Sequence, residues 1–424
     1  MKKLLRLIFI AVIAGVTYKY LTDKDIKVID MFSKAKEWVT SMVEKVEKVE
    51  KVEEVKEIYS SGMPDLDIKT EDEEHGTYGN QRSHYPEVSA ASYSAPDASE
   101  AVEYPVADKR LPGSSKFPEL DKYAMETPSE ADASIEALVG WLMKPASGEL
   151  EKVRLIFTWI ATHVSYDDNG FNTGNYADTS PEGVFRNRVS VCQGYSELFT
   201  AMCRLAGLEA VTVIGYAKGI GYRPGSGFSD TNHAWNAARI DGEWRLFDVT
   251  WGSGYGRGVN GRLVSVQEFN DYWFSVNPDE CVFSHLPGDD AWQLNHPKIT
   301  RYQFESMPYV SALYFKMGFN GSQCLPAVLD GTIDVLPEAY SISGNIKVLS
   351  MPYSGRIPAG QTIKLRVKAG EGVSPAYEND GHISNMTLEG NEYTAFVKTV
   401  PGEFKLMVTY GGGSYETALE YLVQ

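Results

Sequence analysis

The sequence predicts an α+β domain followed by a β-sandwich, and two patterns in the chain support this fold class. Between residues 118 and 307, stretches with apolar residues at helical spacing lead into an alternating β-hairpin. From residue 308 onward, short runs alternate between apolar and polar residues and are separated by glycine-rich turns. A period near 3.6 residues is typical of amphipathic helices, and a period of two is typical of half-buried strands.

Two helices are expected near the start of the α+β domain. The first, in ETPSEADASIEALVGWLMKP, has a buried face made of Ile135, Leu138, Val139 and Leu142. The second, in ELEKVRLIFTWIATHV, has a buried face made of Val153, Ile156, Phe157 and Ile160. The loop SYDDNGFN follows them, so these helices lead into the segment that contains the first cysteine.

The stretch VSVCQGYSELFTAMCRLAGL predicts a third helix that begins at or near Cys192. Apolar residues recur at helical spacing after this cysteine, at Tyr195, Leu198, Phe199, Met202 and Leu205. A thiol at a helix N-terminus has its thiolate stabilised by the positive end of the helix dipole, and the thiolate is the nucleophile. Cys203 lies about three turns further along, roughly 16 Å away, so the two cysteines cannot form a disulfide. Cys192 is therefore the candidate nucleophile.

The other cysteines are interpreted as small buried apolar residues. The chain has four cysteines at irregular spacing, which does not make a disulfide framework. A zinc site would need cysteines two to four residues apart or histidines in matching pairs, and neither pattern occurs. We therefore expect no metal and no other cofactor, and we assign Cys203, Cys281 and Cys324 to the core.

The segment NHAWNAARIDGEWRLFDVTWGSG predicts a β-hairpin. Its Asp-Gly pair, residues 241 and 242, is the strongest two-residue hairpin signal, and alternating strands lie on both sides. If this pair forms the turn, Ile240 pairs with Glu243, Trp235 with Asp248, and His233 with Thr250.

This pairing supplies a base and an acid for Cys192. His233 and Asp248 become diagonal neighbours on one face of the sheet, with Cβ atoms up to about 7 to 8 Å apart. Their side chains can bridge that gap with a hydrogen bond, which holds the imidazole in one tautomer. The other ring nitrogen of His233 is then left for the thiol.

These residues carry a resemblance to a known family. VCQGYSELFTAMCRLAGLEA, NHAWNAARIDGEW and LFDVTWGSG resemble the three blocks of the transglutaminase-like superfamily, in the order Cys, His, Asp. EKVRLIFTWIATHVSYD and YWFSVNPDECVFSHLPGDDAWQL are similar to further blocks of its kyphoscoliosis-peptidase-like branch, and together the blocks cover about residues 120 to 308. The resemblance implies a papain-like α+β fold with Cys192 as nucleophile, His233 as general base and acid, and Asp248 as orienting residue.

One feature departs from the family pattern. Val191 stands where a glycine often precedes the nucleophile, and no side-chain oxyanion donor is assigned. The backbone N–H of Cys192 at the helix start is the donor that physical reasoning supports. Gln193 is either a second candidate donor or an exposed polar helix residue.

Three further residues of these blocks are expected to have supporting roles. Asn232 and Trp235 lie in the histidine block and are expected to support the site without reacting. His285, in FSHLP, is interpreted as a structural histidine.

The implied chemistry is acyl transfer on protein or peptide amides. A Cys-His-Asp triad attacks an amide carbonyl and forms a thioester. Water as the acceptor gives proteolysis or deamidation, and a lysine amine gives a crosslink, so the expected enzyme is a cysteine peptidase or a protein-glutamine transglutaminase or deamidase. The competing interpretation is a non-catalytic, membrane-tethered binding module, against which the intact triad argues.

Charge excludes one class of partner. The chain has 57 acidic and 40 basic residues and a formal net charge of -17. A nucleic-acid surface needs a basic patch that offsets phosphate charge, so nucleic-acid binding is not expected.

The first 21 residues indicate export. A basic start is followed by an apolar run from Leu7 to Val16, which is typical of a cleaved signal peptide or of an uncleaved anchor. The anchor is favoured because no small-x-small cleavage site stands out and the helical pattern continues to Leu21. The basic residues would remain in the cytoplasm, which places the rest of the chain outside it.

Two segments separate this anchor from the folded domains. Residues 22–58 predict a charged helix, and the valines of VEKVEKVEKVEEVKEI recur every three residues, so their stripe winds around the helix. This helix is a solvated stalk or a short coiled coil. Residues 59–117 are rich in Ser, Pro, Asp and Glu and predict a disordered linker. Residues 118–307 then form the catalytic domain, and residues 308–424 a β-sandwich of immunoglobulin-like size.

Overall fold

The computed structural model describes residues 83–84, 101–104, 116–219, 222–223, 225 and 227–424. The anchor predicted at residues 1–21 and the stalk predicted at residues 22–58 lie outside these ranges. Within the described ranges, every helix is too short or too polar to span a bilayer.

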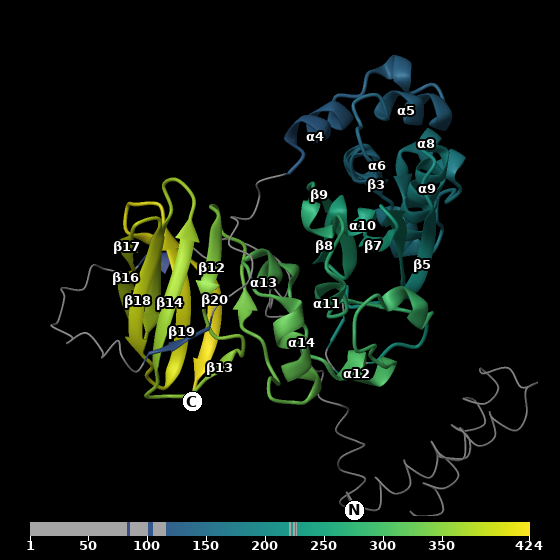
Figure 1. The fold of residues 1–424 in the computed structure, drawn as a ribbon. Helices are drawn as coiled ribbons and strands as arrows, with labels where there is room; N and C mark the ends of the chain where they lie inside the picture. The colour runs from purple at the N-terminus through teal and green to yellow at the C-terminus, as the bar shows by residue number, and fades with distance from the viewer. Residues whose placement is uncertain (1–82, 85–100, 105–115, 220–221, 224, 226) are drawn as a thin grey trace, which may run out of the picture. The chain divides into compact units, whose positions relative to one another are not determined.

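Helices form the first part of the α+β domain (Figure 1). They are α4 (Pro118–Met125), η2 (Ser129–Ala131), α5 (Ile135–Leu142), α6 (Glu149–His163), α7 (Asp168–Thr173), α8 (Pro181–Asn187) and α9 (Cys192–Leu205). α6 contacts α4, α5 and α9, and residues 153–161 of this helix are all buried. The start of the third predicted helix at Cys192 is confirmed, and α6 forms the centre of the helical layer.

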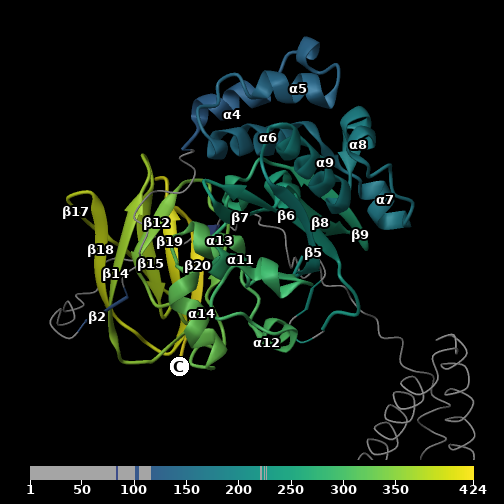
Figure 2. The ribbon, with the colours of Figure 1, turned by 45° about the vertical axis from the view of Figure 1, so that its right-hand side comes forward.

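A four-stranded antiparallel sheet lies against these helices. Its order is β10 (His285–Pro287), β5 (Ala210–Ala217), β6 (His233–Ile240) and β7 (Glu243–Phe247). α9 lies against β5 and β6 (Figure 2). Two small pairs complete the domain, the parallel β3 (Ser165–Tyr166) and β4 (Val189–Ser190) and the hairpin of β8 (Gly254–Val259) and β9 (Arg262–Gln267).

The register of the predicted hairpin is confirmed as far as Phe247. Ile240 pairs with Glu243 and Asn236 with Phe247. The turn residues have φ of 50° and 86°, so both are left-handed, as a type I′ turn requires.

Beyond Phe247 the predicted pairing is wrong. β7 ends there, and α10 (Val249–Gly252) begins. The pairs Trp235–Asp248 and His233–Thr250 therefore do not form. Asp248 is instead the N-cap of α10, because its carboxylate accepts a hydrogen bond from the Trp251 amide, and aspartate is a strongly preferred N-cap residue.

Short helices connect this sheet to the C-terminal strands. They are η3 (Asp271–Trp273), α11 (Pro278–Cys281), η4 (Asp290–Gln293), α12 (Arg301–Ser306), α13 (Ala312–Lys316) and α14 (Gly321–Leu329). The prediction that the β-sandwich begins at residue 308 is wrong for the first part of that segment. Ser311 and Asn320 cap helices α13 and α14, and these side-chain hydrogen bonds favour helix over strand at both places.

The C-terminal strands form two sheets. One contains β11 (Glu338–Ala339), β13 (Arg356–Ile357), β15 (Ser374–Asn379), β16 (His382–Asn385), β19 (Gly402–Thr409) and β20 (Ser414–Val423). The other contains β12 (Ile346–Ser350), β14 (Thr362–Ala369), β17 (Thr387–Glu389) and β18 (Glu392–Lys398). The alternating apolar residues of β14 and β19 are buried, as their period of two predicts. Two sheets are consistent with a sandwich, and the immunoglobulin-like assignment stays a prediction.

Two short strands lie within the predicted linker. β1 (Ser83–His84) pairs antiparallel with β20, and β2 (Val102–Glu103) pairs parallel with β14. The prediction of disorder over residues 59–117 is therefore wrong at these positions. A two-residue edge strand is held by backbone hydrogen bonds and requires no apolar periodicity, so composition gave no signal for it. Glu103 also forms ion pairs with Lys364 and Arg366.

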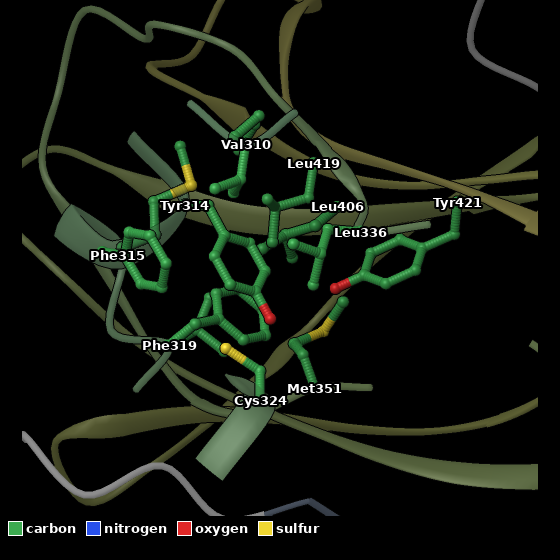
Figure 3. Close-up of a cluster of buried hydrophobic side chains, with 14 of the residues drawn as sticks. Val310, Tyr314, Phe315, Phe319, Cys324, Leu336, Met351, Leu406, Leu419 and Tyr421 are labelled. Carbon is green, nitrogen blue, oxygen red and sulfur yellow. The ribbon is translucent and has the colours of Figure 1, made fainter. Parts of the chain in front are cut away.

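Helices α13 and α14 share one hydrophobic core with the C-terminal strands. Figure 3 shows Tyr314 between Phe319 and residues from β19 and β20. The rings of Tyr314 and Phe319 are stacked with centroids 4.0 Å apart, and the Tyr314 hydroxyl donates to the Tyr353 carbonyl. Cys324 is fully buried in this cluster, as the sequence predicts.

Candidate active site

α9 places Cys192 at its first residue. The preceding Val191 is extended, with φ of -93° and ψ of 176°, and its side chain makes no cap hydrogen bond. The first amides of a helix have no carbonyl partner within the helix, so α9 itself does not use the Cys192 N–H, which is a candidate donor to a substrate. A Cβ on Gly194 would lie 2.1 Å from the Ser190 Oγ. Glycine at this position lets the start of the helix pack directly against β4.

His233 and Asp248 form the predicted hydrogen bond, although Asp248 lies at the start of α10 and not in the predicted strand. His233 is the first residue of β6, and Asp248 caps α10. His233 Nε2 lies 2.7 Å from Asp248 Oδ2, and both residues are buried. This bond occupies Nε2 and leaves Nδ1 as the free ring nitrogen for the Cys192 thiol, and the thiol and the imidazole shift each other's pKa.

The three groups change one another's ionisation. Burial raises the pKa of the Cys192 thiol, but its hydrogen bond with His233, the imidazolium charge and the Ala234 backbone N–H together hold this pKa below its ordinary value. Burial lowers the pKa of His233, but the Asp248 carboxylate and the thiolate outweigh it and raise this pKa to about 10. Burial also disfavours the Asp248 carboxylate, yet the two neighbouring histidines hold its pKa well below its usual range. The three groups therefore stabilise a thiolate–imidazolium pair relative to a neutral thiol and imidazole.

A second histidine contacts the same carboxylate. His285 Nε2 lies 3.0 Å from Asp248 Oδ2, and His285 is 2% exposed. The residue begins β10, which pairs with β5 at Ala217. Interpreting His285 as structural missed this contact. No local pattern could have revealed it, because β10 is brought to the site by a pairing with a strand about 70 residues earlier.

The His233, Asp248 and His285 side chains also form a group that could hold a metal ion, since their ligand atoms lie within 4.8 Å of one another. Sequence spacing missed this group because its members come from β6, α10 and β10. The two nitrogen–oxygen distances of 2.7 Å and 3.0 Å are hydrogen-bond lengths. Two ligands of a tetrahedral zinc ion, each about 2.0 to 2.1 Å from the metal, would lie about 3.3 Å apart. Hydrogen bonding therefore accounts for the arrangement.

Two predicted supporting residues have side-chain partners other than Cys192, His233 and Asp248. Gln193 Nε2 donates to Glu197 Oε1 at 2.9 Å, along the surface of α9. Asn232 accepts from the Ala217 amide at 2.7 Å and donates to the Ala217 carbonyl at 2.9 Å. Asn232 therefore fixes the end of β5 to the start of β6, next to His233, and Gln193 has its amide turned toward its own helix.

Trp235 forms part of the wall of the site. Its ring centroid lies 5.1 Å from that of His285, and the residue is 2% exposed. A Cβ on Gly215 would lie 2.6 Å from Trp235 Cη2, so glycine on the neighbouring strand makes room for the indole. Trp251 and Trp273 also pack against His285, with centroids 4.4 Å and 5.1 Å away. These rings exclude water from the histidine pair and its carboxylate, which strengthens their hydrogen bonds.

Comparison with known proteins identifies the family of the segment that contains these residues. Residues 136–249 match the model of the transglutaminase-like superfamily. This segment contains Cys192, His233 and Asp248. Residues 136–249 belong to the transglutaminase-like superfamily. The transglutaminase-like domain has a papain-like fold of mixed helices and sheets.

The relatives place the domain in the kyphoscoliosis-peptidase-like branch. Human kyphoscoliosis peptidase is 35% identical over 204 residues, which cover 48% of this chain and 30% of that protein. Hillarin of Drosophila melanogaster is 32% identical over 217 residues, which cover 48% of this chain and 26% of that protein. The chain thus spans less than a third of the length of either relative.

A solved structure is also similar. The crystal structure of a putative cysteine protease from Cytophaga hutchinsonii is 24% identical and covers 34% of this chain and 45% of its own, with a TM-score of 0.23.

Proposed function

We propose that this chain is a thiol acyl-transfer enzyme that acts on amide bonds of proteins or peptides. The observation that carries the proposal is that His233 Nε2 lies 2.7 Å from the buried carboxylate of Asp248, while the same imidazole lowers the pKa of the Cys192 thiol at the start of α9. A binding module would not need a buried carboxylate that stabilises an imidazolium beside a thiol at a helix start.

The first half of the reaction forms a thioester. The Cys192 thiolate attacks the amide carbonyl carbon, and the carbonyl electron pair moves to the oxygen, where the Cys192 N–H donates to the oxyanion. When this intermediate collapses, the C–N bond breaks and His233 Nδ1 gives its proton to the leaving amine. The products are a thioester on Sγ and a free amine.

The second half transfers the acyl group to an acceptor. Neutral His233 takes a proton from the acceptor, the acceptor attacks the thioester, and the C–S bond breaks to return the thiolate beside an imidazolium. We propose a backbone amide as the bond that is cleaved and water as the acceptor, which makes the chain a cysteine peptidase. The similarity to proteins named kyphoscoliosis peptidase supports hydrolysis over crosslinking.

A single incubation distinguishes the possible acceptors. The full chain is incubated with a proteome digest and a fluorescent primary amine, and enzyme pretreated with iodoacetamide is the control. We expect new peptide N-termini, detected by mass spectrometry, with little label in the peptides. Amine incorporation would identify an amine as the acceptor, and glutamine deamidation without new termini would identify a side-chain amide as the bond that is hydrolysed; either result would contradict the peptidase assignment. Identical peptides in both arms would contradict enzymatic function.

We also propose that the chain works outside the cytoplasm, with residues 1–21 as its anchor. The basic start followed by the apolar run supports this location. Fractionation of C-terminally tagged full-length protein is expected to place it in the membrane fraction with its tag accessible from outside. Recovery in the cytoplasmic soluble fraction would contradict export. A mature N-terminus at Gly15 would contradict the anchor alone.

A further inference from the structure

One oxygen of Asp248 is shared by two imidazoles. Oδ2 lies 2.7 Å from His233 Nε2 and 3.0 Å from His285 Nε2, while Oδ1 accepts from the Trp251 amide at 2.9 Å. The mechanism uses only the first of these contacts. The Trp251 amide already orients the carboxylate at the N-cap of α10. The second imidazole at Oδ2 is therefore not needed for orientation, and we ask what else it does.

Geometry fixes the proton positions on His285. Its Nε2 faces a carboxylate oxygen, and a bare ring nitrogen there would place two lone pairs against each other, so Nε2 carries the proton and donates. Its Nδ1 lies 2.8 Å from the Ser284 hydroxyl, which also lies 3.3 Å from the Cys281 carbonyl; with the proton on Nε2, Nδ1 is an acceptor, and the hydroxyl donates to it over the shorter distance. Burial lowers the pKa of His285, so the ring is neutral with its proton on Nε2.

Among the described residues, no further charged group faces Asp248 and His285 and could donate to Asp248 Oδ2 in place of His285. The titratable groups that face it are Cys192 from α9, His233 from β6 and Cys281 from α11. Burial raises the pKa of Cys281 far above its ordinary value, so it stays a neutral thiol. The indoles of Trp235, Trp251 and Trp273 also surround His285.

We propose that His285 is a positioning residue that sets how strongly Asp248 holds the His233 imidazolium, by donating a second hydrogen bond to Asp248 Oδ2. The inference rests on the proposed function. An N–H dipole directed at Oδ2 offsets part of the carboxylate charge, and it therefore weakens the attraction between Asp248 and the imidazolium. A less tightly held imidazolium is a better acid toward the leaving amine, which is the step that His233 must perform.

The test measures the imidazolium without any substrate. The full chain is alkylated at Cys192 with iodoacetate and, separately, with iodoacetamide over a range of pH. The ratio of the two rates is then plotted against pH. The anionic reagent is favoured while His233 is charged, so the ratio falls where the imidazolium loses its proton. In His285→Leu we expect this midpoint to move upward by about one pH unit, the change expected when one hydrogen bond to a charged group is lost.

The conservative variant separates positioning from packing. A glutamine side chain at this position would be able to place an N–H near the position of Nε2, so His285→Gln is expected to keep the wild-type midpoint. An unchanged midpoint in His285→Leu, or an equal shift in both variants, would overturn the proposal. Because the readout is alkylation, absence of acyl transfer would contradict the proposed function and leave this test unaffected.

A measurement on the wild type covers the case in which the leucine variant does not fold. Full-length protein labelled with ¹⁵N-histidine is expected to show His285 as the neutral tautomer protonated on Nε2 at neutral pH and above. His285→Gln assigns the signal. A His285 tautomer protonated on Nδ1, or a charged ring at neutral pH, would show that the second bond to Asp248 is not donated as proposed.

Discussion

Replacing Cys192 with alanine is expected to lower amide hydrolysis by at least about 10³-fold while the chain stays folded. In the proposed reaction the sulfur is the atom that attacks the carbonyl, and the other three thiols are buried. The side chain is only half-buried, so its loss removes little packing. Peptide cleavage by purified variant and wild type at equal concentration measures the rate, and circular dichroism checks the fold.

Cys203 is the matched control on the same helix. It is fully buried, and burial raises the pKa of its thiol, so it is a core residue without reactivity. Cys203→Ala should leave a small cavity, cost about 1 kcal/mol of stability and keep the rate. Equal rates for Cys192→Ala and wild type, or a greater loss of rate in Cys203→Ala, would contradict the role of Cys192.

Asp248→Asn is expected to lower kcat by about 10- to 1000-fold. Every contact of the carboxylate is with a donor: two imidazole nitrogens at Oδ2 and the Trp251 amide at Oδ1. Asparagine has one oxygen and one NH2 group, so in either orientation its NH2 faces an N–H group. The variant therefore loses the charge that stabilises the imidazolium, and it also disturbs the hydrogen bonding that orients His233.

The same substitution should lower stability in a pH-dependent way. Folding lowers the pKa of Asp248, so its contribution is present above the unfolded value of about 3.9 and is lost as the pH falls through the folded value. Folding raises the pKa of His233, so its contribution is present below about 6.5 and is lost as the pH rises through about 10. Thermal melts should therefore show the largest deficit between about pH 4 and 6.5, on the order of 2 kcal/mol.

Asp121 provides a control for the loss of a buried carboxylate. It accepts from Arg154 Nε and Nη2 and from the Thr158 hydroxyl, away from the site. Asp121→Asn should lower the melting temperature and keep kcat. A rate for Asp248→Asn above half of the wild-type rate, or a loss of rate just as large in Asp121→Asn, would contradict the orienting role of Asp248.

Much of the candidate site could be predicted because its signals are local. The apolar period after Cys192 places this residue at the start of α9, and the residue 241–242 turn sets the register of β6 and β7. Each signal depends on interactions within about 15 residues, which are visible in the linear sequence. The resemblance to a family added the order of the three reactive residues.

Other features depend on partners that are distant in the chain. The two edge strands β1 and β2 pair with β20 and β14, more than 200 residues away, and their own composition resembles a linker. Helices α13 and α14 have apolar residues that bury against β19 and β20 (Figure 3). Packing of this kind overrides what a short segment favours by itself.

The sequence by itself determined a cysteine at a helix start, a histidine on the following hairpin and the aspartate that meets it. It did so because helix dipole, turn type and strand period act over a few residues. Only the tertiary structure decided that Asp248 leaves the strand to cap α10 and that His285 shares its Oδ2. The physical reason is that β10 reaches Asp248 through its pairing with β5, a long-range contact whose free energy comes from sheet hydrogen bonds and buried tryptophans.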